Sequence, residues 1–379
     1  MLLYSLILHI RHLFYDKGWK KSSPTGIPSV CVGNVAVGGT GKTPMAELII
    51  RTLKEDEAAP EDGFFGSLFG APPKSVAVVS RGYRRKTRGL QEVQPDGTAA
   101  LYGDEPLQIK RKFPEVKVIV DSDRVEACEK LKEHKGSTDI IILDDAFQHR
   151  KIIPTRTIVL TTYSRPFFKD RLLPFGKLRD LPSRVKTADM IVVTKCPPYL
   201  DEWERSKWAR NVGLRLFDLK TCTGVNEDGK RQTLLFSTMV YDKMQPVFSD
   251  GDPRYTHSKL AILFSGIAND EALAMKVKEE YKLLMHRRFP DHHFYTQGNV
   301  DDIEFVARHN ATAVVITTEK DAQRLMDADF SKEKKKAHRI AISPELRKRL
   351  FYAPIRTCML TPEEHDIFKA FLNEIRGAV

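Results

Sequence analysis

The chain has 379 residues, of which 41% are hydrophobic and 29% charged, a balance that excludes a disordered protein and a bundle of membrane spans. Its 61 Lys and Arg residues against 50 Asp and Glu residues give a net charge of +11, which favours nucleic acid, anionic lipid or a phosphorylated small molecule as partner. The length predicts two domains of ordinary size.

The cysteines are odd in number, scattered and without a CxxC pair, which is typical of buried thiols in a reducing compartment rather than of disulfides or a zinc site. They are Cys31, Cys128, Cys196, Cys222 and Cys358.

Residues 1–25 form the first predicted segment, an amphipathic helix associated with a membrane surface. Its apolar residues share one helical stripe: Leu3, Leu6, Ile7, Ile10, Leu13 and Phe14. His9 and Arg11 interrupt the stripe well before the roughly 20 residues that a membrane span needs. Aromatic and lysine residues follow around Trp19, which favours a helix lying in the lipid interface, whereas a helix that covers a hydrophobic core is the alternative.

A glycine-rich stretch follows the apolar run at 27–35 and precedes a segment with helical spacing. Its loop residues are Ala36, Val37, Gly38, Gly39, Thr40, Gly41, Lys42 and Thr43. Backbone N–H groups of such a loop converge on a phosphate, the lysine reaches the β- and γ-phosphates, and the Thr43 hydroxyl binds Mg²⁺. Ala36 stands where the usual pattern has glycine. The order of strand, loop and helix therefore predicts a nucleotide phosphate site.

Near-continuous Val and Ile runs predict strands buried on both faces of a parallel sheet. They lie at residues 76–83, 116–123, 139–145, 155–163 and 188–195. Residues 215–250 have the pattern of two strands around a turn. A second α/β unit follows, with strands predicted at 259–267, in the run AVVITTEKD and at 338–343.

The run at 139–145 ends in Asp144 and Asp145, a carboxylate pair at the edge where such sheets bind ligands. With the glycine loop nearby, we expect the pair to hold Mg²⁺, although the sequence leaves open which Asp is closer to the ion and whether the pair only caps a turn. The stretch at 193–197 resembles a guanine-reading motif, but Pro197 occupies the position of the required Asp. This departure favours ATP over GTP.

Several motifs in this order closely resemble the tetraacyldisaccharide 4′-kinase family of the lipid A pathway, and they span residues 32–325. They are VGNVAVGGTGKTP, SRGYRRKTRG, GDEP, DDAFQHR, LLPFGKLRD, FSGIAND, FPDHHFYT and TTEKDAQRL. The resemblance implies an ATP- and Mg²⁺-dependent kinase that phosphorylates the 4′-hydroxyl of a lipid-linked disaccharide phosphate. It also implies a peripheral protein, expected to be monomeric, on the anionic cytoplasmic face of the bacterial inner membrane.

The fold implied by the resemblance is a P-loop NTPase-like parallel-sheet domain and a smaller α/β/α domain, joined by a two-stranded β linker. The corresponding boundaries in this chain are 26–214 for the kinase domain, 215–257 for the linker and 258–379 for the smaller domain. The irregular insertion at 55–73 carries no family motif and receives no role.

The resemblance also assigns roles to individual residues. Asp104 of GDEP is expected to accept the proton of the sugar hydroxyl, with His292 or His293 as its partner. Arg81, Glu105 and Arg179 are expected to contact substrate or phosphate. The residue after Arg179 is commonly Glu in the family and is Asp180 here, which shortens its reach.

Two hypotheses from other classes remain at this stage. A P-loop ATPase that acts as a nucleotide-gated carrier or chaperone would hydrolyse ATP without phosphorylating a lipid. A basic nucleic-acid-binding protein is disfavoured, because no nucleic-acid-binding motif accompanies the positive charge; we expect no nucleic acid partner.

Overall fold

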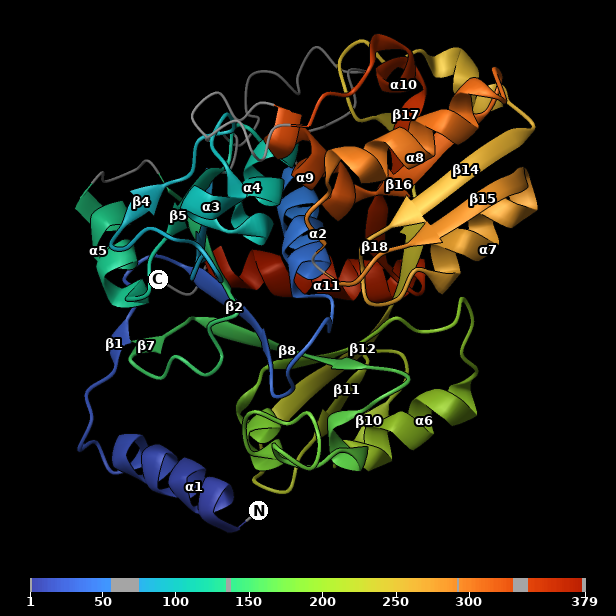
Figure 1. Cartoon of the computed structure of the whole chain (residues 1–379). Helices are drawn as coiled ribbons and strands as arrows, with labels where there is room; N and C mark the ends of the chain where they lie inside the picture. Colours follow the sequence, from blue (N-terminus) through green and yellow to red (C-terminus); the bar gives the residue numbers. More distant parts are fainter. Residues whose placement is uncertain (1, 56–74, 134–137, 292, 330–339, 377–379) are drawn as a thin grey trace, which may run out of the picture. The chain divides into compact units, whose positions relative to one another are not determined.

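The computed structural model describes residues 2–55, 75–133, 138–291, 293–329 and 340–376 (Figure 1). Nearly all of the predicted 55–73 insertion, and His292, lie outside the described residues. The chain divides into two compact units, one of Met1–Met239 with Thr357–Val379 and the other of Val240–Arg356. Among the described residues, no helix is both long enough and apolar enough to cross a bilayer.

The first unit is built on an 11-stranded, mostly parallel sheet (Figure 1). In spatial order its strands are β10 (Arg215–Asp218), β11 (Thr223–Val225), β12 (Arg231–Tyr241), β9 (Met190–Thr194), β8 (Arg156–Thr162), β2 (Ser29–Asn34), β6 (Ile140–Asp144), β3 (Val76–Ser80), β5 (Lys117–Val120) and β4 (Gln91–Glu92), with β18 (Ile355–Met359) also paired to β12. The five strands predicted from Val and Ile runs are neighbours or near neighbours in its parallel centre, flanking β2.

Side chains of each central strand alternate between two hydrophobic cores, one on each face of the sheet. Val30 of β2 belongs to one core and Cys31 to the other. The first face is covered by α2 (Lys42–Glu55), α4 (Asp104–Lys112) and α11 (Pro362–Arg376), and the second by α5 (Arg124–Glu133) and α6 (Glu202–Asn211). Because both faces are covered, the strands carry apolar residues throughout, as predicted.

Further elements complete the first unit. They are α1 (Leu2–Asp16), α3 (Ala99–Tyr102), the 3₁₀ helices at Phe167–Lys169 and Pro182–Thr187, and a small parallel pair of β1 (Ser23–Pro24) and β7 (Ile152–Ile153).

The second unit is a smaller five-stranded α/β sheet. Its strands in spatial order are β13 (Gln245–Pro246), β17 (Leu350–Ala353), β16 (Val314–Thr318), β14 (Leu260–Ser265) and β15 (Lys282–Arg288). Its helices are α7 (Glu271–Glu280), α8 (Gln297–Arg308), α9 (Glu319–Asp329) and α10 (Pro344–Arg349), with a 3₁₀ turn at Pro253–His257. The strand predicted at 338–343 is absent from the described part of that range, 340–343. Ile340 and Ile342 pack into the core instead, and β17 is the strand that pairs with β16.

Two predicted boundaries differ from the structure. The segment 357–379, predicted in the smaller domain, belongs to the first unit, because Phe368 and Leu372 of α11 are buried in the core beside Met45 of α2. The hairpin predicted as a linker at 215–257 instead extends the large sheet through β10, β11 and β12. The two strands at which the chain passes between the units are β12 and β18, which pair with each other.

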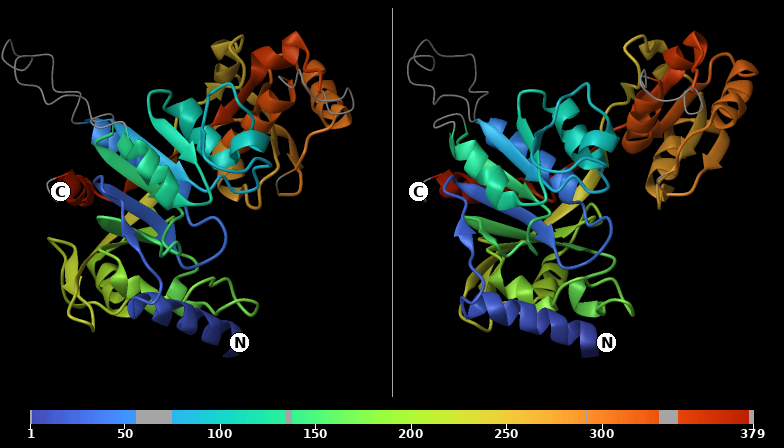
Figure 2. Two further views of the ribbon diagram at one scale, coloured as in Figure 1. Left: turned by 90° about the vertical axis from the view of Figure 1, so that its left-hand side faces the viewer. Right: turned by 60° about the vertical axis from the view of Figure 1, so that its left-hand side comes forward.

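Helix α1 lies along the outside of the first unit (Figure 2). Its buried side chains, among those described, are Leu8 and His12. The described residues of the predicted apolar stripe face solvent instead of a core: Leu6, Ile7, Ile10, Leu13 and Phe14. The alternative of a helix whose stripe covers a hydrophobic core is therefore wrong.

The cysteines were predicted to be buried thiols, and the structure places four of the five in the core and leaves Cys358 half-buried. Four thiols are buried, and burial raises the pKa of Cys128 and of Cys196 to about 12, that of Cys222 to about 11 and that of Cys31 further still. Because the thiolate is the nucleophile, we expect iodoacetamide at pH 8 to label the half-buried Cys358 of the folded chain faster than these four. Mass spectrometry of peptides before and after denaturation measures this; rapid labelling of Cys31 in the folded chain would contradict it.

Candidate active site

The glycine-rich loop joins β2 to α2 with a backbone that favours glycine. Gly38 and Gly41 have φ values of +104° and +87°, where a Cβ atom is strained. Helix α2 begins at Lys42 directly after the loop, so its first N–H groups and the positive end of its dipole lie at this point. The loop from Val37 to Gly39 is exposed. This geometry is suited to an anion.

Asp144 lies beside this loop because β2 and β6 are parallel neighbours, with Val32 opposite Asp144. The Ser80 hydroxyl donates to one Asp144 oxygen at 3.1 Å. The other oxygen, Oδ1, is buried and has no hydrogen-bond partner among the described residues. A buried carboxylate oxygen without a partner is costly unless a cation or water satisfies it. This oxygen and the hydroxyl of Thr43, the second residue of α2, are hard oxygen donors of the kind that Mg²⁺ prefers.

Asp145 is held differently from Asp144. The guanidinium of Arg179 donates to both oxygens of Asp145, with Nη1 3.2 Å from Oδ2, and the Lys42 ammonium lies 3.8 Å from Oδ1. The same guanidinium donates to Asn34 at 2.6 Å, and Asn34 donates to the hydroxyl of Thr40 at 2.5 Å. Arg179 therefore joins the acidic pair to the glycine loop.

The two carboxyl groups consequently differ in acidity. Burial raises the pKa of Asp144 to about 6, and the charge of Asp145 adds to this effect. Burial acts on Asp145 too, but the charges and hydrogen bonds of Lys42 and Arg179 outweigh it and hold the pKa of Asp145 below its usual value. With a pKa of about 6, Asp144 is mostly ionised at neutral pH, so its carboxylate is available to a cation, and we expect cation binding to weaken as the pH falls through about 6.

The GDEP turn lies next to the same edge of the sheet. Gly103 has a φ of +93°, and a Cβ atom there would come within 3.1 Å of the Gly82 backbone. Glycine at position 103 therefore allows the GDEP turn to pack closely against the turn at Gly82. Helix α4 then begins at Asp104, which is half-buried. The charge of Glu105 also raises the pKa of Asp144, which places GDEP and the acidic pair in one site.

Two arginines surround the pair. Arg81 is exposed directly after β3. Arg124, the first residue of α5, is only 4% exposed, and its charge interacts with those of Arg81 and the acidic pair. This residue was not identified from the sequence alone. Its position after a buried strand was the available signal, since the carboxyl ends of parallel strands meet at one edge.

Both histidines proposed as partner of Asp104 belong to the second unit by their position in the chain. His292 lies outside the described residues. The Nε2 of His293 is 2.8 Å from the Asn299 side-chain oxygen, and its ring stacks on Phe289 at 4.6 Å between centroids. These contacts fix the His293 ring within its own unit.

Comparison with known proteins identifies the family. The family model described as tetraacyldisaccharide-1-P 4′-kinase matches residues 1–368. The chain belongs to this kinase family. A tetraacyldisaccharide 4′-kinase of Porphyromonas gingivalis is 34% identical over 100% of this chain and 95% of the relative. One of Parabacteroides distasonis is 36% identical over 86% of this chain and 82% of the relative.

A solved member of the same kinase family has the same fold. The LpxK of Aquifex aeolicus, crystallised in complex with ATP, has a TM-score of 0.67 at 23% identity and covers 99% of this chain and 96% of its own. The predicted α/β class, with a P-loop NTPase-like parallel sheet and a smaller α/β unit, is thereby confirmed. The family recognised from the motifs is confirmed as well.

Proposed function

We propose that this chain transfers the γ-phosphoryl group of ATP to the 4′-hydroxyl of a tetraacyldisaccharide 1-phosphate in lipid A biosynthesis. Membership of the kinase family supports the reaction. The structural observation that carries it is the unpartnered Asp144 oxygen beside an anion-binding glycine loop. Neither the geometry nor the relatives favour the alternative of a nucleotide-gated carrier or chaperone.

In this proposal the first unit holds the nucleotide. The loop amides and Lys42 bind the phosphates, while Asp144 and Thr43 hold Mg²⁺, with Asp145 beside them. Among the described residues, no group of three or more His, Cys, Asp or Glu side chains is arranged for a metal, so phosphate oxygens and water would complete the shell. When bound, Mg²⁺ would neutralise charge that develops on the phosphates.

The acceptor is held by the neighbouring residues. Asp104 orients the sugar hydroxyl and accepts its proton, and a histidine of the DHH motif, His292 or His293, assists it. Because the transition state of phosphoryl transfer is loose, the main contribution of Asp104 is to position the hydroxyl. Arg81 and Arg124 provide positive charge for a phosphate of the substrate or nucleotide.

Helix α1 is proposed to attach the enzyme peripherally to the anionic cytoplasmic face of the inner membrane. Its exposed apolar stripe is followed by the exposed Trp19 and by basic residues, and Lys20 lies over the rings of Phe14 and Tyr15 at 5.9 Å. Such a helix lies in the interface with its apolar face among the acyl chains. A membrane location also brings the enzyme to its lipid substrate.

The membrane proposal predicts the effect of two exposed substitutions. Ile7→Ser with Ile10→Ser removes apolar area from the stripe without removing a buried side chain, so we expect the flotation of the protein with anionic vesicles to fall about tenfold. Met275→Ser is the control, because Met275 on α7 is an apolar residue that is even more exposed than Ile7 and Ile10. Equal flotation of both variants would contradict the anchor.

The reaction itself is tested with γ-labelled ATP and a tetraacyldisaccharide 1-phosphate in detergent micelles. We expect label in the lipid, and the label should survive mild acid, because an anomeric 1-phosphate is hydrolysed there and a 4′-phosphate ester is not. Label found only as inorganic phosphate would contradict the kinase proposal and favour the carrier alternative. Label lost in mild acid would contradict the 4′ position.

A further inference from the structure

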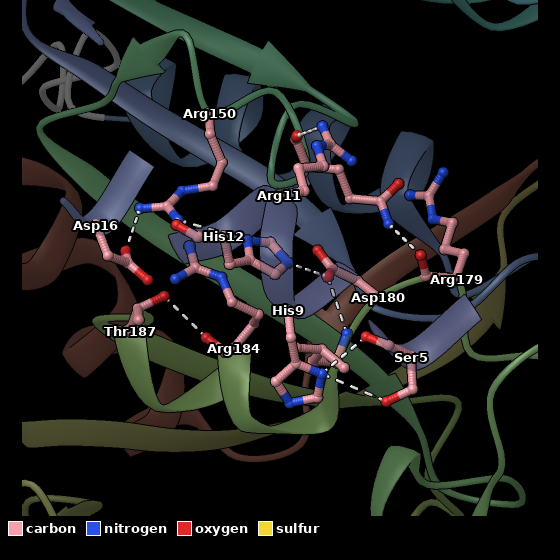
Figure 3. A network of polar contacts seen from close by, with 12 residues as sticks. Ser5, His9, Arg11, His12, Asp16, Arg150, Arg179, Asp180, Arg184 and Thr187 are labelled. Carbon is pink, nitrogen blue, oxygen red and sulfur yellow. Dashed lines mark hydrogen bonds and ion pairs between the residues drawn. The ribbon is translucent and has the colours of Figure 1, made fainter. Parts of the chain in front are cut away.

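Helix α1 is joined to the nucleotide site through a buried polar contact that the reaction does not explain. His12 Nε2 lies 2.6 Å from Asp180 Oδ1, and their side chains are 6% and 1% exposed (Figure 3). Burial would raise the pKa of Asp180, but hydrogen bonds from His12 and from the Leu181 backbone outweigh it and keep the pKa below its usual value. His12 therefore meets an ionised carboxylate.

The same helix also holds the backbone of the residue before Asp180. The Tyr4 hydroxyl donates to the Arg179 carbonyl at 3.0 Å, and the Gln148 amide donates to that carbonyl at 2.9 Å. Arg11 in turn donates to the Gln148 backbone carbonyl at 2.7 Å. The Arg179 carbonyl thus accepts from Tyr4 of α1 directly and from Gln148, which Arg11 of a later turn of α1 holds in turn (Figure 3 shows Arg11 and Arg179).

A third group fixes the carboxyl-terminal half of the helix. Arg150 donates to the His12 carbonyl at 3.0 Å and to Asp16 at 2.7 Å. Apolar packing contributes less to the attachment of α1, because Leu8 is the one buried apolar residue among the described side chains of the helix. The helix is therefore held on the first unit largely by directed polar contacts, which set position more strictly than apolar burial does.

Arg179 is the residue that these contacts position. Its own N–H donates to the Val35 carbonyl at 2.8 Å, directly before the glycine loop. Its guanidinium then bonds to Asp145 and to Asn34. Removing a hydrogen bond that orients the residues around a metal site typically lowers metal affinity or activity 10- to 100-fold.

We infer that His12 and Asp180 are positioning residues of the nucleotide site: they clasp α1 to the 179–180 peptide and so hold Arg179 on Asp145 and Asn34. The inference rests on the proposed Mg·nucleotide site. It gives α1 a second role, since the helix that carries the exposed stripe also completes the support of the acidic pair. The Asp180 side chain, although shorter than that of glutamate, is long enough to contact the His12 imidazole.

The inference is tested by binding of a fluorescent (mant-labelled) ATP to the full-length protein in detergent, with and without Mg²⁺. We expect His12→Ala to weaken binding in Mg²⁺ about tenfold and to change Mg²⁺-free binding little. His12→Gln, which keeps an N–H donor near the Nε2 position, should recover most of the loss. His9→Ala is the matched control, because His9 is exposed on the same helix and bonds within it to the Ser5 carbonyl.

A double-mutant cycle separates positioning from general stability. If His12 acts through Arg179, His12→Ala should cause no further loss of binding in an Arg179→Ala background. Additive losses, or a His12→Ala protein with wild-type Mg²⁺-dependent binding, would overturn the inference.

Should His12→Ala not fold, Tyr4→Phe provides the measurement, since it removes one hydroxyl to the Arg179 carbonyl while keeping the ring. We expect it to weaken Mg²⁺-dependent binding about threefold, and unchanged binding would overturn the inference. Failure of the inference and failure of the proposed function give different results. A wild-type protein that binds no nucleotide contradicts the function. Normal binding by wild type that the His12 and Tyr4 substitutions leave unchanged contradicts the inference alone.

Discussion

Asp104→Asn is expected to reduce phosphoryl transfer to the lipid about 10³-fold and to leave nucleotide affinity within about twofold of wild type. The substitution preserves the size of the side chain at the start of α4 but removes the charge that accepts the hydroxyl proton. The loop, Lys42 and the acidic pair remain unchanged. Single-turnover transfer from γ-labelled ATP, measured beside mant-ATP binding, separates the two quantities.

The control for this variant is Asp96→Asn. Asp96 is an exposed aspartate in the turn before α3, in the same part of the chain, so the same loss of charge should leave transfer unchanged. If Asp104→Asn transferred phosphate at the wild-type rate, the proposed role of Asp104 as proton acceptor would be wrong. Loss of nucleotide binding in the same variant would instead mean that Asp104 supports the phosphate site.

The centre of the first unit was predictable because its signals are local. A run of Val and Ile of strand length has few other uses in a soluble protein, and a glycine loop placed between a strand and a helix has a defined geometry. The neighbour relation of β2 and β6, which brings Asp144 to the loop, follows from the general rule for ligand edges of parallel sheets.

Element boundaries were less predictable because side-chain contacts set them. Helix α8 begins at Gln297, three residues before the apolar spacing that starts at Val300, because the Thr296 hydroxyl accepts from the Asn299 N–H and the Asn299 side chain accepts from the Thr296 N–H. The segment 340–342 has the composition of a strand, yet Ser343 caps α10 directly after it and the two isoleucines fill the core.

Features that depend on distant segments left no local signal. The return of α11 to the first unit depends on the match between its apolar face and that of α2, which ends more than 300 residues earlier in the chain. The contact of His12 with Asp180 joins residues 168 positions apart. Arg124 resembles an ordinary helix residue until the sheet places it at the ligand edge.

Lys42→Met is expected to have the other large effect, a loss of about 10³-fold in transfer together with weaker Mg·nucleotide binding. Lys42 is the cation at the start of α2, 3.8 Å from the half-buried Asp145, and Asp144 beside it is buried. Methionine keeps the length and apolar stem of the side chain, so the change removes mainly a positive charge. Initial rates across a range of ATP and Mg²⁺ concentrations measure both losses.

Lys54→Met tests whether position or total charge matters. Lys54 lies in the last turn of the same helix and pairs with Glu115, so its loss changes the net charge equally but at the end far from the loop. We expect near-normal transfer, because a surface ion pair contributes little. If both lysine variants lost activity alike, long-range attraction of the anionic substrate would explain the effect. If only Lys42→Met loses activity, the charge of Lys42 acts on the phosphates directly, as its position at the loop predicts.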